Sequence, residues 1–182
     1  MRKILFVDGC VRGRERSSTY QVARAFLEAF QKANPQDQLE EVELLRQKPE
    51  CFTGKEIELR DQLLREGRLD APLFDLARQF AQADGILVAA PYWDLSFPAL
   101  VKAYIENVSV CGITFGYGPE GQELGLCKAK KLLFVTTSGG AFPEEQRWLR
   151  GTGMDYWKAL CWMFGIPDFD FLWVQGAGFG RK

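Results

Sequence analysis

The 182-residue sequence contains no histidine. This absence removes the commonest general base, the Ser–His and Cys–His nucleophile pairs and the usual ligand of transition metals. An enzyme of this composition must use carboxylates, tyrosine, lysine or a cofactor that carries the chemistry itself, and the last option fits best. We therefore expect neither a catalytic side chain nor a metal site.

Disulfide and zinc-binding patterns are also missing. The cysteines are odd in number and include no CxxC pair; they are Cys10, Cys51, Cys111, Cys127 and Cys161. Such a set indicates free thiols in a reducing compartment. The expected location is the cytoplasm.

Neither a strong charge of one sign nor a long apolar run is present. The formal net charge of −1 argues against a nucleic-acid partner and against the strongly acidic surface of a dedicated electron carrier. No apolar run reaches the roughly 18–20 residues needed to span a bilayer. Arg2 and Lys3 lead directly into a strand pattern rather than a signal peptide. We expect no membrane insertion.

Apolar runs alternate with helical patterns along the chain, as in a mainly parallel sheet with helices on both faces. The length fits a single α/β domain over residues 1–182. The patterns predict strands at 4–7, 39–45, 85–90, 131–137 and 169–174, helices at 18–33, 55–65, 71–83, 98–108 and 143–164, and a loop or hairpin at 112–128. In the first helix, Val22, Phe26 and Phe30 recur at i, i+4 and i+8 and predict the buried stripe. The expected architecture is a three-layer sandwich around a five-stranded parallel sheet in the order 2-1-3-4-5.

The loop after the first predicted strand has the composition of an anion site. In such sheets ligands bind outside the carboxyl ends of the strands, where the strand order reverses. Three hydroxyl side chains begin the following helix and three arginines precede them: Ser17, Ser18 and Thr19, and Arg12, Arg14 and Arg16. Unpaired N–H groups and the helix dipole favour an anion there, so the loop predicts a phosphate seat. The alternative is a serine N-cap beside solvated arginines.

The loops after the third and fourth predicted strands suit a flat ring. Pro91, Tyr92, Trp93, Asp94 and Leu95 place large aromatic and apolar side chains where solvent exposure is expected. The isoalloxazine ring of flavin mononucleotide (FMN) would explain them, and packing against a partner subunit would also do so. The paired glycines at 139 and 140 let a backbone approach a ligand closely.

Four segments together resemble the FMN-dependent NAD(P)H azoreductases and quinone reductases of the flavodoxin-like superfamily. They are Asp8-Gly9-Cys10-Val11-Arg12 with Ser17-Ser18-Thr19, the run Pro91-Tyr92-Trp93-Asp94-Leu95-Ser96-Phe97-Pro98 continuing to Glu106, Gly112-Ile113-Thr114-Phe115, and Thr137-Ser138-Gly139-Gly140-Ala141-Phe142. The resemblance covers most of the chain in the right order. It implies a flavodoxin-like fold, a homodimer and a ping-pong reaction: NADH or NADPH reduces FMN, which then reduces a quinone, an azo compound or a similar flat acceptor.

The resemblance also implies the residues that hold FMN. The phosphate would meet Ser17, Ser18 and Thr19, with Cys10 and Arg12 beside them. The ring and ribityl chain would lie against Pro91, Tyr92, Trp93, Asp94 and Leu95, and the pyrimidine side would meet Thr137, Ser138, Gly139, Gly140 and Phe142. Phe115, Tyr117 and Trp148 are candidates for the substrate wall, with core or dimer packing as the alternative for each.

The sequence departs from the family pattern at several positions. Cys10 stands where serine is usual and is either a reactive thiol of lowered pKa or a passive substitute. Asp94 replaces asparagine, and its charge would lower the reduction potential of a nearby flavin. Trp93 replaces tyrosine and keeps a stacking face. The sequence ends at Lys182, soon after the fifth predicted strand.

Three other functions remain as hypotheses. A flavodoxin-type electron carrier would bind FMN and accept no electrons from nicotinamide. A relative that has lost FMN through Cys10 and Asp94 would take up none. A response-regulator receiver is disfavoured, because Asp8 stands without an acidic cluster and Pro91-Tyr92-Trp93 occupies the phosphoacceptor position.

Overall fold

A five-stranded parallel sheet forms the centre of the computed structural model, which describes residues 1–177. The strands lie in the order β2-β1-β3-β6-β7, which confirms the predicted order. Every neighbouring pair is parallel. The strands are β1 (Lys3–Asp8), β2 (Gln38–Glu43), β3 (Gly85–Ala89), β6 (Lys131–Thr137) and β7 (Asp168–Val174).

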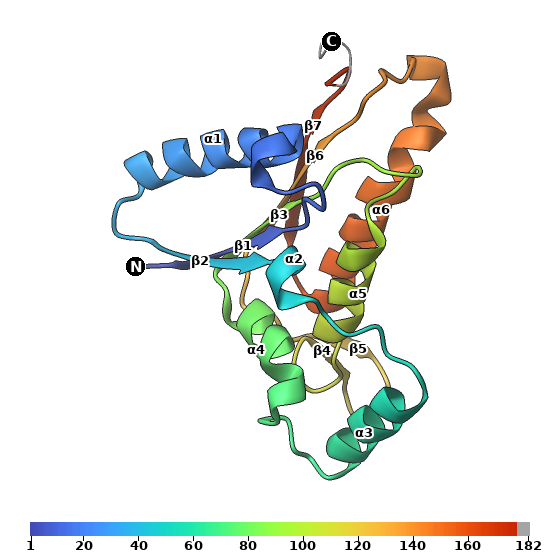
Figure 1. Cartoon of the computed structure of the whole chain (residues 1–182). Helices are drawn as coiled ribbons and strands as arrows, with labels where there is room; N and C mark the ends of the chain where they lie inside the picture. The colour runs from blue at the N-terminus through green and yellow to red at the C-terminus, as the bar shows by residue number, and fades with distance from the viewer. Residues whose placement is uncertain (178–182) are drawn as a thin grey trace.

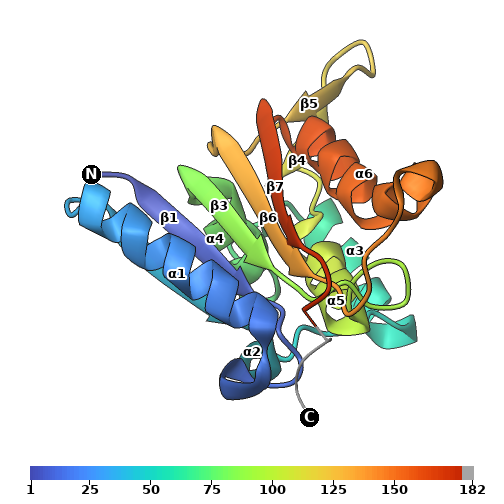
Figure 2. The same ribbon diagram turned by 90° about the horizontal axis from the view of Figure 1, so that it is seen from above.

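Helices cover both faces of this sheet. They are α1 (Ser18–Ala33), α2 (Leu44–Gln47), α3 (Gly54–Arg65), α4 (Asp75–Gln82), α5 (Ala99–Val108) and α6 (Arg147–Phe164), with short 3-10 turns η1 (Arg14–Arg16), η2 (Pro72–Phe74) and η3 (Glu144–Gln146). Helix α1 lies on one face, and α4, α5 and α6 lie on the other (Figures 1 and 2). Within residues 1–177, no helix has the length and apolar content needed to cross a membrane.

The predicted elements are present, with small differences at their ends. The second strand stops at Glu43 instead of continuing to residue 45, because Leu44 begins α2. Pro98 is the N-cap of α5 rather than part of its first turn. Residues 112–128 contain a two-stranded antiparallel hairpin, β4 (Phe115–Tyr117) and β5 (Glu123–Gly125).

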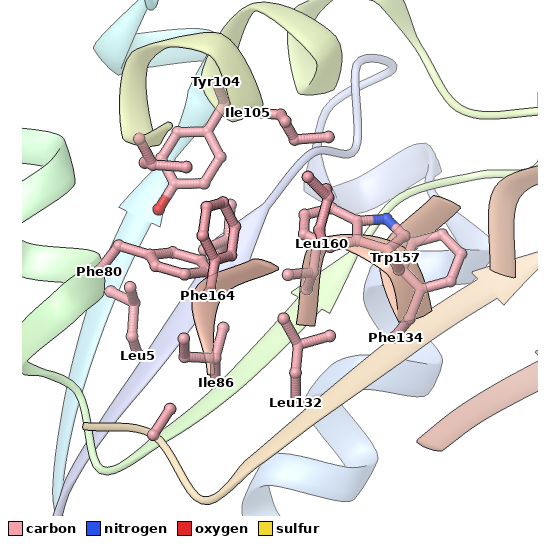
Figure 3. Packing of buried hydrophobic residues seen from close by; sticks show 14 of the residues in the cluster. Leu5, Phe80, Ile86, Tyr104, Ile105, Leu132, Phe134, Trp157, Leu160 and Phe164 are labelled. Atoms are coloured by element: carbon pink, nitrogen blue, oxygen red, sulfur yellow. The ribbon is translucent and has the colours of Figure 1, made fainter. Parts of the chain in front are cut away.

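Large aromatic side chains fill the face under α4, α5 and α6 (Figure 3). The ring centroids of Phe134 and Trp157 are 5.9 Å apart, and those of Phe80 and Phe164 are 5.3 Å apart. All four side chains are at most 1% exposed. Strands that are covered on both faces have continuous apolar runs in their sequence. Such runs predict β1, β3 and β6 from the sequence alone.

The opposite face is packed by smaller side chains, and the stripe predicted for α1 is only partly right, because Val22 packs against this face but is not among the buried residues of the helix. Thr19, Ala23 and Leu27 are buried, whereas Phe26 is 39% exposed. The predicted row and the observed row of side chains have the same helical spacing and are offset by one position along the sequence. Periodicity alone therefore does not decide which row is buried. The small side chain of Ala23 packs beside Phe6 of β1, which lets the helix lie close to the sheet.

The β4–β5 hairpin lies at the end of the sheet where the strands begin. The Lys130 N–H donates to the Asp84 carbonyl (3.0 Å), next to the start of β3. The Cys127 N–H donates to the carbonyl of Phe164, the last residue of α6 (3.1 Å). A Cβ on Gly125 would lie 2.0 Å from the backbone N of Gly165, so the hairpin and the end of α6 meet at backbone contact. Figure 2 shows this hairpin at the far end of the sheet from α2.

A candidate cofactor cleft at the carboxyl edge of the sheet

The loops after β1, β3 and β6 converge on one cleft, as the sequence predicted. Its volume is about 320 Å³, within the usual range for small-molecule sites. The cleft is lined by Val11, Arg12, Arg16, Ser17, Ser18, Thr19, Pro91, Tyr92, Trp93, Thr137, Ser138, Gly139 and Ala177. The strand order reverses at β1 and β3, so the cleft occupies the position that doubly wound sheets use for ligands.

The start of α1 forms one end of the cleft. Ser17 caps the helix by accepting a hydrogen bond from the Tyr20 N–H (3.1 Å). The hydroxyl groups of Thr19 and Thr137 are 2.7 Å apart and join α1 to the end of β6 across the cleft floor. The first N–H groups of a helix have no partner within the helix, so this end of the cleft offers donors to an anion.

The three arginines of the first loop do not act alike. Arg12 and Arg16 line the cleft and are exposed. Arg14 instead forms ion pairs with Asp8 (3.0 Å) and with Glu41 and Glu43 of β2. Two of the three arginines therefore face the predicted phosphate site. The third does not, because acidic side chains from the neighbouring strand bind it.

Cys10 lies beneath the cleft and is 3% exposed. Its Sγ is 3.8 Å from the Ala89 carbonyl oxygen, and its N–H donates to the Asp8 carboxylate (3.0 Å). Burial raises the pKa of the Cys10 thiol from an ordinary value of 9.0 to about 12, against the opposing effect of hydrogen bonding to Ser17. The hypothesis of a reactive thiol with a lowered pKa is wrong, and the passive alternative agrees with this environment.

The loop after β3 ends in a tight turn beside the cleft. The N–H of Trp93 donates to the Ser96 carbonyl (3.1 Å), and the N–H of Ser96 donates back to the Trp93 carbonyl (2.9 Å). The two central residues, Asp94 and Leu95, have φ values of 51° and 63°. Left-handed backbone costs a non-glycine residue about 1–2 kcal/mol. The Thr152 hydroxyl of α6 donates to the Leu95 carbonyl and helps to hold this conformation.

Three aromatic rings adjoin the other end of the cleft. The centroids of Tyr92, Phe142 and Trp173 are 5.2–5.3 Å apart in each pair. The Tyr92 hydroxyl donates to the Leu149 carbonyl in the first turn of α6. The cleft thus combines a cationic end rich in donors with an end that offers ring faces and glycine backbone. A molecule with a phosphate at one end and a flat ring at the other matches both.

A family model described as flavodoxin-like fold matches residues 2–182. The chain belongs to this family. A relative from Clostridium acetobutylicum is named FMN-dependent NADH:quinone oxidoreductase. It is 34% identical to this chain over an alignment that covers 93% of this chain and 84% of the relative. An enzyme of the same name from Clostridium perfringens is 33% identical with the same coverage. The crystal structure of an azoreductase from Bacillus anthracis superposes with a TM-score of 0.84 at 25% identity, covering 98% of this chain and 88% of that one. The resemblance read from the sequence is confirmed.

Among the predicted cofactor residues of this flavodoxin-like chain, ten line the cleft. They are Arg12, Ser17, Ser18, Thr19, Pro91, Tyr92, Trp93, Thr137, Ser138 and Gly139. The other five lie beneath or beside it: Cys10, Asp94, Leu95, Gly140 and Phe142. Arg16, which was expected near the phosphate, also lines the cleft, and Val11 and Ala177 line it without having been predicted as site residues. Val11 could have been found from its neighbours in the first loop, whereas Ala177 reaches the cleft only through the path of the chain after β7.

The three predicted substrate residues do not come together in this flavodoxin-like fold. Phe115 and Tyr117 lie on the β4–β5 hairpin, at the opposite end of the sheet from the cleft, and Tyr117 is 62% exposed. A seven-residue strand separates the two ends by about 20 Å. Trp148 is in the first turn of α6, close to the loop after β3, and is 70% exposed.

Proposed function

We propose that this protein is an FMN-dependent oxidoreductase that takes electrons from NADH and reduces a quinone, an azo compound or a similar flat acceptor. The observation that carries the proposal is the cleft. One end of the cleft has a helix N-terminus and two arginines, and the other end has aromatic side chains and glycine backbone. The names of the clostridial relatives supply the choice of NADH and quinone. When bound, FMN would supply the redox chemistry by accepting a hydride and passing two electrons on.

The donors at the cationic end fit a phosphate. Ser17, Ser18 and Thr19 begin α1, and Arg12 and Arg16 face the same space. We assign these residues to the FMN phosphate, because hydrogen bonds from charged groups to a phosphate are strong. Cys10 supports this loop from below, through its N–H bond to Asp8, rather than through its thiol.

The opposite end fits the flavin ring. We assign Pro91, Tyr92 and Trp93 to one side of the ring, and Thr137, Ser138 and Gly139 to its pyrimidine side. Asp94, Leu95, Gly140 and Phe142 shape the two loops that carry these residues. The exposed Asp94 carboxylate lies on the tight turn beside Trp93, where its charge would disfavour the anionic reduced flavin and lower the reduction potential.

We further infer that the chain works in the cytoplasm as a homodimer and that residues 1–182 act as one domain. All five cysteines are free thiols, which supports a reducing compartment. Trp93, Leu95 and Trp148 are exposed near the cleft, which supports a partner surface there. Phe115 and Tyr117 can wall a substrate only from a second copy, because they lie too far from the cleft of their own chain.

Titration of flavin-free protein with FMN tests the cofactor assignment. We expect saturable quenching or enhancement of flavin fluorescence with one FMN per chain. No uptake of FMN would refute the proposal and would support a relative that has lost the cofactor. FMN uptake without reduction by NADH or NADPH would support the electron-carrier alternative.

A further inference from the structure

The chain at the end of β7 runs along the loop after β6 and is bonded to it at several points. We call residues 173–177 the clamp and residues 138–142 the glycine loop. The Ser138 N–H donates to the Val174 carbonyl (3.0 Å), and the Ala177 N–H donates to the Ser138 carbonyl (2.9 Å). The Gly176 N–H donates to the Gly140 carbonyl (3.3 Å). These backbone bonds continue the pairing of β6 and β7 beyond the sheet.

Two side chains of the clamp add bonds that reach further into the glycine loop. The indole N–H of Trp173 donates to the Ser138 hydroxyl (3.1 Å), which itself donates to the Gly140 carbonyl (2.7 Å). The side-chain oxygen of Gln175 accepts a hydrogen bond from the Phe142 N–H (2.8 Å). The Ser138 hydroxyl is thus a relay between Trp173 and the backbone of Gly140.

The two glycines at the centre of the glycine loop have no side chains that could pack and hold the backbone in place. A Cβ added to Gly139 or Gly140 would meet nothing within 4 Å. Glycine backbone loses more conformational entropy on ordering than any other residue. The order of this loop must therefore come from its neighbours, and the clamp bonds to it at both ends.

Trp173 also connects two sides of the cleft. Its ring lies 5.2 Å from that of Tyr92 and 5.3 Å from that of Phe142. Tyr92 and Ser138 line the cleft, and Trp173 contacts both without being one of the lining residues. The indole is placed to set the spacing between the loops after β3 and β6 without touching the ligand.

We propose that Trp173 and Gln175 are positioning residues for the cofactor. Acting through the Ser138 hydroxyl and the Phe142 N–H, they hold the glycine loop in the conformation that receives the flavin ring. This inference rests on the proposed function, because it takes FMN as the ligand. A loop ordered before binding loses less entropy on binding, so the intact clamp gives tighter binding.

A double-mutant cycle on FMN affinity tests the relay. Trp173→Phe keeps an aromatic ring and removes the N–H, and Ser138→Ala removes the hydroxyl. We expect each to raise the Kd for FMN about 5- to 10-fold, measured by flavin fluorescence, and the double variant to be no weaker than Ser138→Ala alone. Trp162→Phe is the matched control, because Trp162 is 68% exposed on α6 and lies far from the cleft. The Kd of this variant for FMN should stay within twofold of the wild-type value. An unchanged Kd in Trp173→Phe, or fully additive effects, would overturn the relay.

Hydrogen exchange in the flavin-free protein tests the clamp without any ligand. Gln175→Leu removes the acceptor of the Phe142 N–H, so that amide should exchange at least 10-fold faster, whereas Trp162→Phe should leave it unchanged. Equal exchange in Gln175→Leu and wild type would overturn the clamp. Wild-type protein that takes up no FMN would overturn the proposed function instead, and the exchange rates would still decide whether the clamp orders the loop.

Discussion

The two edges of the sheet are built in opposite ways. At the edge where the strands begin, the start of β1 bonds to the residue before β3: the Asp84 N–H donates to the Lys3 carbonyl (2.8 Å), and the Lys3 N–H donates to the Asp84 carboxylate (2.7 Å). The Lys130 N–H, just before β6, donates to the Asp84 carbonyl (3.0 Å) and closes this edge further. At the edge where the strands end, the loops part around the cleft and direct a helix N-terminus, two arginines and glycine backbone toward it.

This difference shows how one sheet separates stability from binding. The backbone groups of Lys3, Asp84 and Lys130 at the closed edge bond within the protein, so they contribute to folding and offer little to a ligand. Hydrogen-bonding groups at the open edge are held in place by the fold, and some of their donors and acceptors face the cleft. The strained turn at Asp94 and Leu95 is at the open edge, where backbone strain is common in binding sites.

The largest expected contrast between the edges is in thiol reactivity. Cys10 is buried under the open edge, and Cys111 is exposed just before the hairpin. A rise in the Cys10 pKa from 9.0 to about 12 lowers its thiolate fraction at neutral pH about 1000-fold. We expect iodoacetamide to modify Cys10 at least 100 times more slowly than Cys111, as measured by peptide mass spectrometry. Equal rates would show that the open edge is not packed as described.

The same raised pKa has a consequence for stability. The unfolded thiol ionises above about pH 9, whereas the folded thiol stays neutral up to about pH 12. The contribution of Cys10 to the free energy of unfolding is therefore complete below pH 9 and is lost as the pH rises toward 12. Cys10→Ala should reduce this loss, which denaturant titrations at pH 8 and pH 10 would measure.

A methyl group at the closed edge should damage the fold and spare binding. Gly125→Ala places a Cβ against the backbone of Gly165, and we expect a loss of about 3 kcal/mol and a Tm lower by roughly 6–12 °C. Gly54→Ala is the matched control, because its Cβ would meet nothing within 4 Å. The folded Gly125→Ala protein should bind FMN within twofold of wild type. A large loss of affinity would contradict the separation of the two edges.

Removing the cations of the open edge should have the reverse effect. The double variant Arg12→Ala/Arg16→Ala should bind FMN about 30-fold more weakly, a loss of about 2 kcal/mol, with little change in Tm. The loss should shrink at high salt because the interaction is electrostatic. Arg24→Ala, further along α1 and paired with Glu28, should leave the Kd within twofold. Equal effects of Arg24→Ala and the double variant would show that the FMN phosphate does not bind at this loop.

The smallest effect is expected for the hairpin side chain Tyr117. Tyr117→Ala should leave the Kd for FMN unchanged, because the residue is at the closed edge of its own chain. In a homodimer whose hairpin reaches the partner's cleft, it should raise KM for a quinone several-fold at constant kcat. Steady-state kinetics combined with light scattering would measure both properties.

The sheet order and the three cleft loops could be predicted because they follow from local patterns: buried apolar strands, helix starts and glycine pairs. Features that depend on distant contacts could not. Arg14 leaves the cleft because β2 supplies Glu41 and Glu43, and no local signal marks that pairing. Trp173 and Ala177 reach the glycine loop only through the pairing of β6 and β7. The buried stripe of α1 depends on which adjacent row of side chains fits the sheet.

Anaerobic reduction of the FMN-loaded protein by NADH tests the central claim most directly. In a stopped-flow mixing experiment, the absorption of oxidised flavin should bleach in a saturable phase and recover when a quinone is added. Bleaching and recovery together would establish a cleft that binds FMN and exchanges electrons with both reactants. A protein that holds FMN but shows no bleaching with NADH or NADPH would contradict the account.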